Sequence, residues 1–254
     1  MVLCFDTKDK QLTKQHFAFV LRNETLVKLR NNIRFFHNGS KLKANRPMNV
    51  VMIALESASR LSFIRHMNFT ESYLRNELDA VELLGYNKAA LNTFPNVLMM
   101  LLGITWGEMN DPMEYYDGYP FIWKDFMKNG YVSLTGRDSY NFSVFHHLSK
   151  GFKWKPFDYY MRTYILGLET TNYRDSLCSG NDLVFQSLLD QLTEFVTVYN
   201  DVPHFTFTFI SNPSHDDPNG LGIVDLPLRR TLTDLNTRGS LDNTVLLIFS
   251  DHGS

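Results

Sequence analysis

Apolar residues gather in three short continuous runs that polar stretches of the chain separate. Residues 49–55 read NVVMIAL, residues 203–210 read PHFTFTFI, and residues 244–249 read TVLLIF. Runs of this length that are rich in β-branched and aromatic residues predict strands, and the first and last are typical of strands buried within a sheet. A fourth strand is predicted over residues 131–134, directly after Gly130.

Segments with apolar residues at helical spacing lie between the predicted strands. They predict helices over residues 67–78, 97–102, 123–129, 181–199 and 224–237. Asn92 or Thr93 caps the start of the second of these helices, with Pro95 in its first turn. Strands that alternate with helices predict an α/β fold around a mostly parallel central sheet.

The first part of the chain differs from the rest in its composition. Residues 1–46 are polar and become basic toward Arg46, and Asn38-Gly39-Ser40 marks a turn within them. We interpret residues 1–46 as an N-terminal appendage and residues 47–254 as one domain, joined at Arg46-Pro47.

Composition narrows the possible classes of protein. The 254 residues suit one large domain with a short appendage, and the aromatic content of 14% argues against disorder. With 25 basic and 27 acidic residues, the net charge of −2 argues against a general nucleic-acid-binding protein. No run of 18 apolar residues predicts a membrane-spanning helix, and residues 1–10 lack the pattern of a signal peptide.

Two kinds of residue bear on the cellular compartment without deciding it. Asn-x-Ser/Thr sequons, the acceptors of N-linked glycans, occur at Asn23, Asn38, Asn68 and Asn141, and they favour a secreted protein weakly. The two cysteines, Cys4 and Cys178, either pair with each other or remain thiols.

Polar residues with metal-binding side chains follow each of the three apolar runs. Glu56 follows the first run, His215 and Asp216 follow the second, and Asp251-His252 follows the third. Because the carboxyl ends of parallel strands meet along one edge of a sheet, we expect these groups to converge there. Thr93, at the start of a predicted helix, is a fourth candidate, since a helix N-terminus attracts anions.

Each candidate has a structural interpretation beside the functional one. Glu56 and Thr93 are residue types that begin helices, and His215-Asp216 lies in a segment of turn-forming residues. Asp251-His252 is more specific, because Gly253 lets the backbone approach a ligand closely.

Together the four groups predict metal-assisted chemistry. A hydroxyl is a weak nucleophile at neutral pH unless a base or a metal removes its proton. Glu56, Asp251 and His252 would hold a divalent ion, with Thr93 as both a ligand and the catalytic nucleophile. This mixture of oxygen and imidazole ligands suits zinc best, and manganese is the other candidate.

The same residues carry a resemblance to a known superfamily. The strings SRLSFIRHM (59–67), GYNK (85–88), NTFPN (92–96) and SDHG (250–253) resemble an animal family of uncharacterised, sulfatase-like extracellular proteins. That family belongs to the alkaline phosphatase–sulfatase superfamily, so the resemblance implies a three-layer α/β/α sandwich and a location in the secretory pathway or outside the cell.

The resemblance also implies roles for individual residues. Glu56, Asp251 and His252 match the ligands of the superfamily's nucleophile-side metal, and Thr93 matches its nucleophile. His215, with Asp216 beside it, matches the position of a substrate or second-metal ligand. Glu as first ligand with Thr as nucleophile also resembles the phosphoethanolamine and glycerol-phosphate transferases of bacterial envelopes.

Departures from the family pattern refine this expectation. Sulfatases need Cys or Ser in a Cys/Ser-x-Pro-x-Arg motif, whereas residues 93–97 read TFPNV, which argues against sulfate esters. Ala90-Leu91 replaces the usual Gly-Asp, and Glu56 replaces an Asp. A two-metal member needs a further His after the Asp-His-Gly segment, so we expect the domain to be incomplete at its C-terminus.

The leading expectation is a metal-dependent phosphoryl transferase, or a hydrolase of phosphodiesters or phosphomonoesters. Its substrate would be a phosphorylated small molecule, a glycan or a lipid, and Arg60, Lys88 and Arg137 are candidate contacts for the anion. The alternative is a catalytically inactive or truncated relative with a binding role. No motif identifies the substrate.

Overall fold

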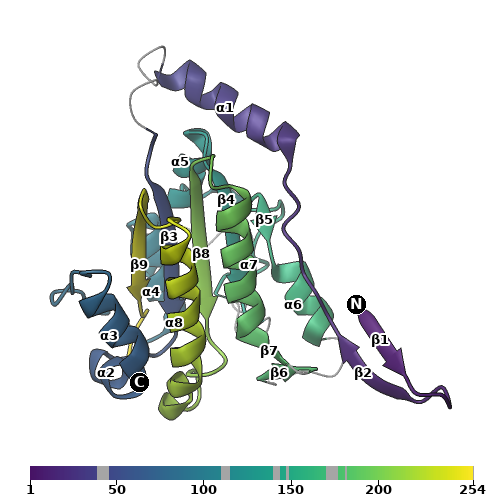
Figure 1. The fold of residues 1–254 in the computed structure, drawn as a ribbon. Helices are drawn as coiled ribbons and strands as arrows, with labels where there is room; N and C mark the ends of the chain where they lie inside the picture. Colours follow the sequence, from purple (N-terminus) through teal and green to yellow (C-terminus); the bar gives the residue numbers. More distant parts are fainter. Residues whose placement is uncertain are drawn as a thin grey trace.

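A five-stranded sheet with every described pair parallel forms the centre of the protein in a computed structural model (Figure 1). The structure describes residues 1–38, 46–109, 115–139, 144–146, 149–169, 177–180 and 182–253. The strand order is β5-β4-β8-β3-β9. These strands are β3 (Asn49–Leu55), β4 (Val132–Arg137), β5 (Tyr159–Tyr160), β8 (His204–Ile210) and β9 (Thr244–Phe249).

The interior strands lie where the apolar runs predict them. On β3, Met52 and Ala54 pack into one core while Ile53 and Leu55 pack into the other, so both faces of this strand are buried. All seven residues of β8 are buried as well. The alternation of Thr and Phe along β8 therefore separates two interior faces rather than a core face and a solvent face.

The third apolar run forms a strand that is less buried than its sequence predicts. β9 pairs with β3 and lies at the edge of the sheet within the described residues. None of its residues is fully buried, and Val245 and Leu247 are 38% and 37% exposed. The prediction of a buried strand here is wrong because burial depends on what covers an edge, which an apolar run alone does not encode.

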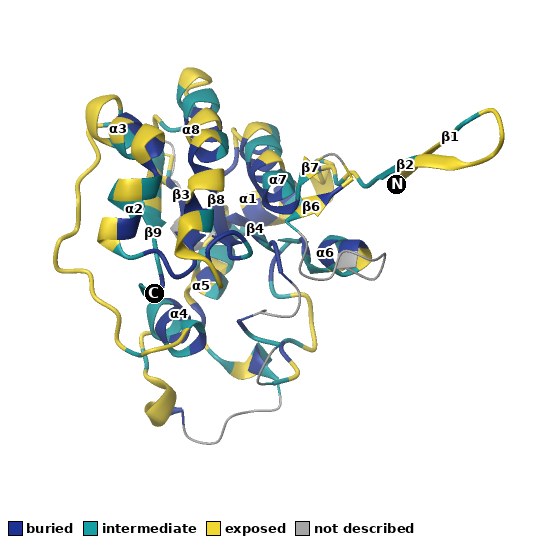
Figure 2. Ribbon diagram, turned by 90° about the horizontal axis from the view of Figure 1, so that it is seen from below, coloured by how far each residue is buried: buried dark blue, intermediate teal, exposed yellow. Residues whose placement is uncertain are grey.

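Helices cover both faces of the sheet and make the fold a three-layer sandwich. α2, α3, α7 and α8 lie on one face, whereas α4 and α5 lie on the other (Figure 2). The helices are α1 (Glu24–Asn38), α2 (Arg60–His66), α3 (Asn68–Asn76), α4 (Thr93–Leu102), α5 (Ile122–Lys128), α6 (Arg162–Glu169), α7 (Val184–Val198) and α8 (Gly222–Thr237). The predicted α/β class is thereby confirmed.

Several elements were not predicted from the sequence. α1 and α6 are amphipathic helices, and α2 is a short helix that directly precedes α3. Two short hairpins lie outside the central sheet. They are formed by β1 (Val2–Phe5) with β2 (Gln11–Gln15), and by β6 (Cys178–Ser179) with β7 (Asp182–Leu183).

The N-terminal segment runs along the sandwich and ends in the β1–β2 hairpin, which extends away from it (Figures 1 and 2). Val20 and Val27 belong to the core that α7 and α8 cover. Arg30 on α1 forms an ion pair of 2.6 Å with Asp158, and both side chains are 9% exposed. These contacts attach residues 20–30 to the rest of the fold, and the boundary at residue 46 stays a prediction.

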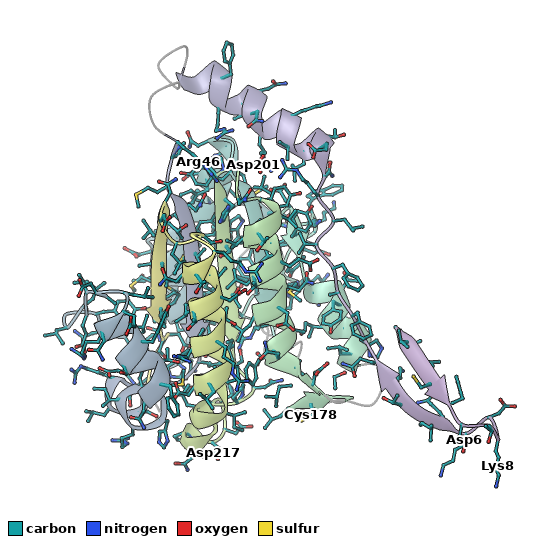
Figure 3. The ribbon with its side chains drawn as sticks, viewed as in Figure 1. Asp6, Lys8, Arg46, Cys178, Asp201 and Asp217 are labelled. Atoms are coloured by element: carbon teal, nitrogen blue, oxygen red, sulfur yellow. The ribbon has the colours of Figure 1, made fainter. Side chains whose placement is uncertain are left out.

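No helix in the described ranges is both long and apolar enough to span a bilayer. Cys4 and Cys178 are both exposed and do not form a disulfide with each other. Figure 3 places Asp217 at the end of the sandwich opposite Arg46 and Asp201. Asp201 precedes β8 and Asp217 follows it, so the end near Asp217 is the carboxyl end of the parallel strands.

Candidate active site

Thr93 is the first residue of α4 and is held in place by its neighbours. The buried side chains of Phe94, Val97 and Leu98 anchor α4 to the sheet. The Asn96 side chain binds the preceding loop, because its Oδ1 accepts hydrogen bonds from the backbone N–H groups of Ala89 and Ala90. Its Nδ2 donates to the carbonyl oxygens of Ala90 and Asn92. This loop and helix therefore fix the position of the Thr93 hydroxyl.

The Thr93 hydroxyl contacts two of the predicted metal ligands. Its Oγ1 donates to Oε1 of Glu56 over 2.8 Å and lies 3.2 Å from Nε2 of His252. Glu56 follows β3 and His252 follows β9, and β3 and β9 are neighbours. The predicted convergence at the carboxyl ends of the strands is therefore observed for these three residues.

Glu56 is 1% exposed and also forms a buried ion pair. Its Oε2 accepts a hydrogen bond of 2.6 Å from Nη2 of Arg137, the last residue of β4. The Arg137 guanidinium stacks over the ring of Phe209, 4.5 Å from its centroid. Burial lowers the pKa of Arg137, and the charge of Glu56 opposes that shift. Of the three basic candidates, Arg137 is thus the one that reaches the site.

Asp251 is 2% exposed, and only one of its two carboxylate oxygens accepts hydrogen bonds. Its Oδ1 accepts from the backbone N–H of Ser57 over 3.1 Å and from Ser250 Oγ over 3.4 Å. Its Oδ2 is buried without a hydrogen-bond partner and lies 3.4 Å from Nε2 of His252. Ser57 has a positive φ of 57°, which places a strained backbone turn directly after Glu56.

Gly253 allows the chain after β9 to approach the start of α2. A Cβ atom at Gly253 would lie 2.7 Å from Cβ of Ser59, which is closer than real Cβ atoms come. Ser59 caps α2 by accepting a hydrogen bond from the backbone N–H of Ser62. In this structure the close approach at Gly253 is therefore made to Ser59.

His215 and Asp216 lie beside this cluster. Nε2 of His215 is 3.8 Å from Oε1 of Glu56, and Nδ1 is 2.7 Å from Oδ1 of Asp216. The side chains are 31% and 87% exposed, respectively. His215 thus borders the site, whereas the Asp216 carboxylate faces solvent, and the roles of both stay predictions.

Asp138 is a residue of this region that the sequence reasoning missed. It directly follows β4, is 1% exposed, and accepts hydrogen bonds from the backbone N–H groups of Ser211 and Asn212 over 2.7 and 3.0 Å. Burial raises its pKa to about 6, against the effect of those two donors. Asp138 fixes the start of the segment that carries His215, and its place after a strand was the available signal.

The other predicted residues that the structure describes are exposed. Arg60 pairs with Glu82 at the surface, and Lys88 is exposed. Asn23 and Asn68 are exposed, whereas Asn141 and the side chain of Asn38 lie outside the described residues.

The donor set fits a divalent cation. Glu56, Asp251 and His252 supply the oxygen and imidazole ligands that zinc and manganese accept, and the buried Oδ2 of Asp251 accepts no hydrogen bond. In the described part of the chain, however, no three His, Cys, Asp or Glu side chains already form a metal-binding group. The Oε2 atom of Glu56 is instead engaged by Arg137.

The fold that carries this cluster is found in a solved enzyme structure. The lipoteichoic acid synthase LtaP from Listeria monocytogenes matches 90% of this chain with a TM-score of 0.53 and 16% sequence identity. The chain spans 62% of the length of LtaP. The match shows that this chain and LtaP share an α/β fold, as the strand and helix pattern of the sequence predicts.

A comparison of the sequence with protein families identifies the family of this chain. The profile of a family described as protein of unknown function (DUF229) matches residues 1–254, and the chain belongs to this family. This finding confirms the resemblance carried by the NTFPN and SDHG strings. No curated protein matches the chain.

Proposed function

We propose that this protein is a metal-dependent phosphoryl transferase or phosphoester hydrolase with Thr93 as its nucleophile. The observation that carries the proposal is the position of Thr93 Oγ1, 2.8 Å from Glu56 and 3.2 Å from His252. A hydroxyl at the start of a helix, among buried metal-binding side chains, is the arrangement that phosphoryl transfer to a side chain requires. LtaP, which shares the fold, is by its name a synthase of lipoteichoic acid.

Glu56, Asp251 and His252 would hold the cation, zinc or manganese. When bound, it would lower the pKa of the Thr93 hydroxyl and stabilise negative charge on the phosphoryl oxygens. Thr93 Oγ1 then attacks phosphorus, the Oγ–P bond forms, and the bond from phosphorus to the leaving alcohol breaks. The hydroxyl proton is released and the leaving oxygen takes one up.

The resulting phosphothreonine is resolved by water or by an acceptor alcohol. Arg137 supplies positive charge beside Glu56, and His215 borders the open side of the cluster. Arg137 would contact the phosphoryl oxygens and His215 would exchange protons with the leaving or entering oxygen. The substrate in this proposal is a phosphorylated small molecule, a glycan or a lipid.

A second candidate is a non-catalytic binding protein. The ion pair between Glu56 and Arg137 favours it, because Arg137 neutralises Glu56 without a metal. The absence of a ready-made group of three metal-binding side chains among the described residues points the same way. Metal retention and turnover distinguish the two candidates.

The proposed function is tested by stripping the protein with a chelator, adding Zn²⁺ or Mn²⁺, and removing the excess. We expect about one equivalent of ion to be retained, and bis(p-nitrophenyl) phosphate or p-nitrophenyl phosphate to be hydrolysed only by the loaded protein. Asp251→Asn should lose the ion, whereas Asp234→Asn, in a surface pair with Arg238, should retain it. A protein that neither retains an ion nor turns over either ester is the binding protein instead.

We also propose a location in the secretory pathway or outside the cell. The exposed sequon residues Asn23 and Asn68 would then carry glycans. Asn23 caps α1 through Oδ1, which accepts from the backbone N–H of Leu26, so a glycan on Nδ2 leaves that cap intact. Expression in animal cells should give a protein whose mass falls on endoglycosidase treatment, by less in Asn23→Gln and Asn68→Gln. An unchanged mass contradicts this location.

A further inference from the structure

A small cavity lies against the carboxyl end of β4, beside the candidate active site. Its volume is about 60 Å³, and residues of β4, α5 and α6 and two phenylalanines of β8 contribute to its wall. Seven aromatic side chains of the described residues line it, among them Trp123, Phe157, Phe207 and Phe209. A space of this size holds roughly four waters or an apolar group of about four to five non-hydrogen atoms.

The charged side chains among the described residues of the cavity wall are all basic. Arg137 and Arg162 line the cavity, and no Asp or Glu is among its described lining residues. Aromatic walls stabilise an apolar group, whereas guanidinium groups stabilise an anion. The wall therefore suits a ligand in which a small apolar group is attached directly to an anionic group.

Arg137 connects this cavity to the nucleophile. Its Nη2 donates to Glu56, which in turn accepts from Thr93 Oγ1. A second connection runs through the ring of Phe145 in the cavity wall, which packs edge-on against Phe94, the residue after Thr93, with 6.5 Å between ring centroids. Arg137 therefore belongs both to the cavity wall and to the candidate active site.

Two nitrogen atoms of Arg137 lack partners. Nη2 donates to Glu56, whereas Nε and Nη1 are buried and donate no hydrogen bond to the protein. A buried cationic donor without an acceptor costs free energy, so a site that retains one is prepared for an acceptor from outside. An anionic oxygen of a ligand is the acceptor that a guanidinium binds best.

From this arrangement we infer that the cavity is a recognition pocket for a small apolar group bonded to the phosphoryl centre or to its ester oxygen, with Arg137 contacting the phosphoryl oxygens. The inference rests on the proposed function and narrows its substrate class to phosphoesters with a compact apolar group near phosphorus. Substrates with a polar polyol at that position fit the wall poorly, because its aromatic side chains offer a hydroxyl few partners.

The test compares ligands that differ only in that group. Dissociation constants of methylphosphonate, n-butylphosphonate and 4-hydroxybutylphosphonate are measured by calorimetry on the Zn²⁺-loaded and the metal-free protein. Three buried methylene groups should make n-butylphosphonate bind about 10- to 50-fold more tightly than methylphosphonate. The hydroxylated analogue should lose most of that gain.

Matched variants locate the preference. Ile165→Phe should fill the cavity and remove the preference for the butyl group, with little change for methylphosphonate, because Ile165 is 2% exposed and lines the wall. Ile223→Phe, on α8 at 41% exposure, makes the same chemical change away from the cavity and should retain the preference. Phe207→Leu should enlarge the cavity and favour hexylphosphonate. Thermal unfolding of each variant verifies that it is folded.

The outcomes separate this inference from the proposed function. Equal binding of methyl- and butylphosphonate, binding of neither, or an unchanged preference in folded Ile165→Phe overturns the pocket. A butyl preference that Ile165→Phe removes supports the pocket, even in a protein that hydrolyses no ester. In that case the proposed catalysis fails while the recognition pocket remains.

Discussion

Replacing Thr93 with alanine is expected to reduce phosphoester turnover by about 10⁴-fold or more, because it removes the attacking atom of the proposed reaction. The fold should be unaffected, since Thr93 is only partly buried and α4 is held by Phe94, Val97 and Leu98. Steady-state hydrolysis of bis(p-nitrophenyl) phosphate by the Zn²⁺- or Mn²⁺-loaded protein measures the effect. Metal retention by the variant should stay near one equivalent, because Glu56, Asp251 and His252 remain.

Two variants make this experiment specific. Thr93→Ser keeps a hydroxyl at the same position and should retain measurable turnover, whereas Thr237→Ala, at the exposed end of α8, should match the unmodified protein. Mass spectrometry of acid-quenched protein should find a phosphoryl group on the peptide that contains Thr93. Unchanged turnover in Thr93→Ala, with no phosphorylated peptide, would show that another group attacks phosphorus.

The interior strands of the sheet could be predicted because the apolar residues that form them are adjacent in the sequence. The NVVMIAL run gave β3 with its observed bounds, since a strand buried on both faces needs an unbroken apolar sequence. Glu56 and His252 could be grouped from the same information, because parallel strands bring their carboxyl ends to one edge. Thr93 begins a helix instead, and it joined the group through its position at a helix N-terminus and through the family resemblance.

Other features depend on contacts that no local pattern encodes. The exposure of Val245 on β9 depends on what lies beside that edge of the sheet. Arg137 ends β4 and Asp138 follows it, yet an arginine and an aspartate at a strand end are usually solvated. Their burial, and the ion pair with Glu56, result from the packing of Phe209 and of the 211–212 backbone around them.

Glu56→Gln is expected to have two separate effects, because Glu56 is both a predicted metal ligand and the partner of a buried cation. The metal-loaded protein should lose most of its turnover and its retained ion, since a neutral amide is a poor ligand for zinc. The metal-free protein should also lose stability, by about 3–5 kcal/mol in free energy of unfolding, because Arg137 is left buried without a counter-ion. Urea unfolding in the presence of a chelator measures the second effect without any contribution from metal binding.

A surface pair supplies the matched control for this stability effect. Glu82→Gln breaks the surface ion pair between Glu82 and Arg60, whose side chains are 40% and 55% exposed, and should leave the free energy of unfolding nearly unchanged. The double variant Glu56→Gln/Arg137→Leu should recover part of the loss seen in Glu56→Gln, because it removes the uncompensated charge along with its partner. If Glu56→Gln unfolds at the same urea concentration as the unmodified protein in chelator, the buried charge of Arg137 is neutralised by other groups. Glu56 would then act through the metal alone.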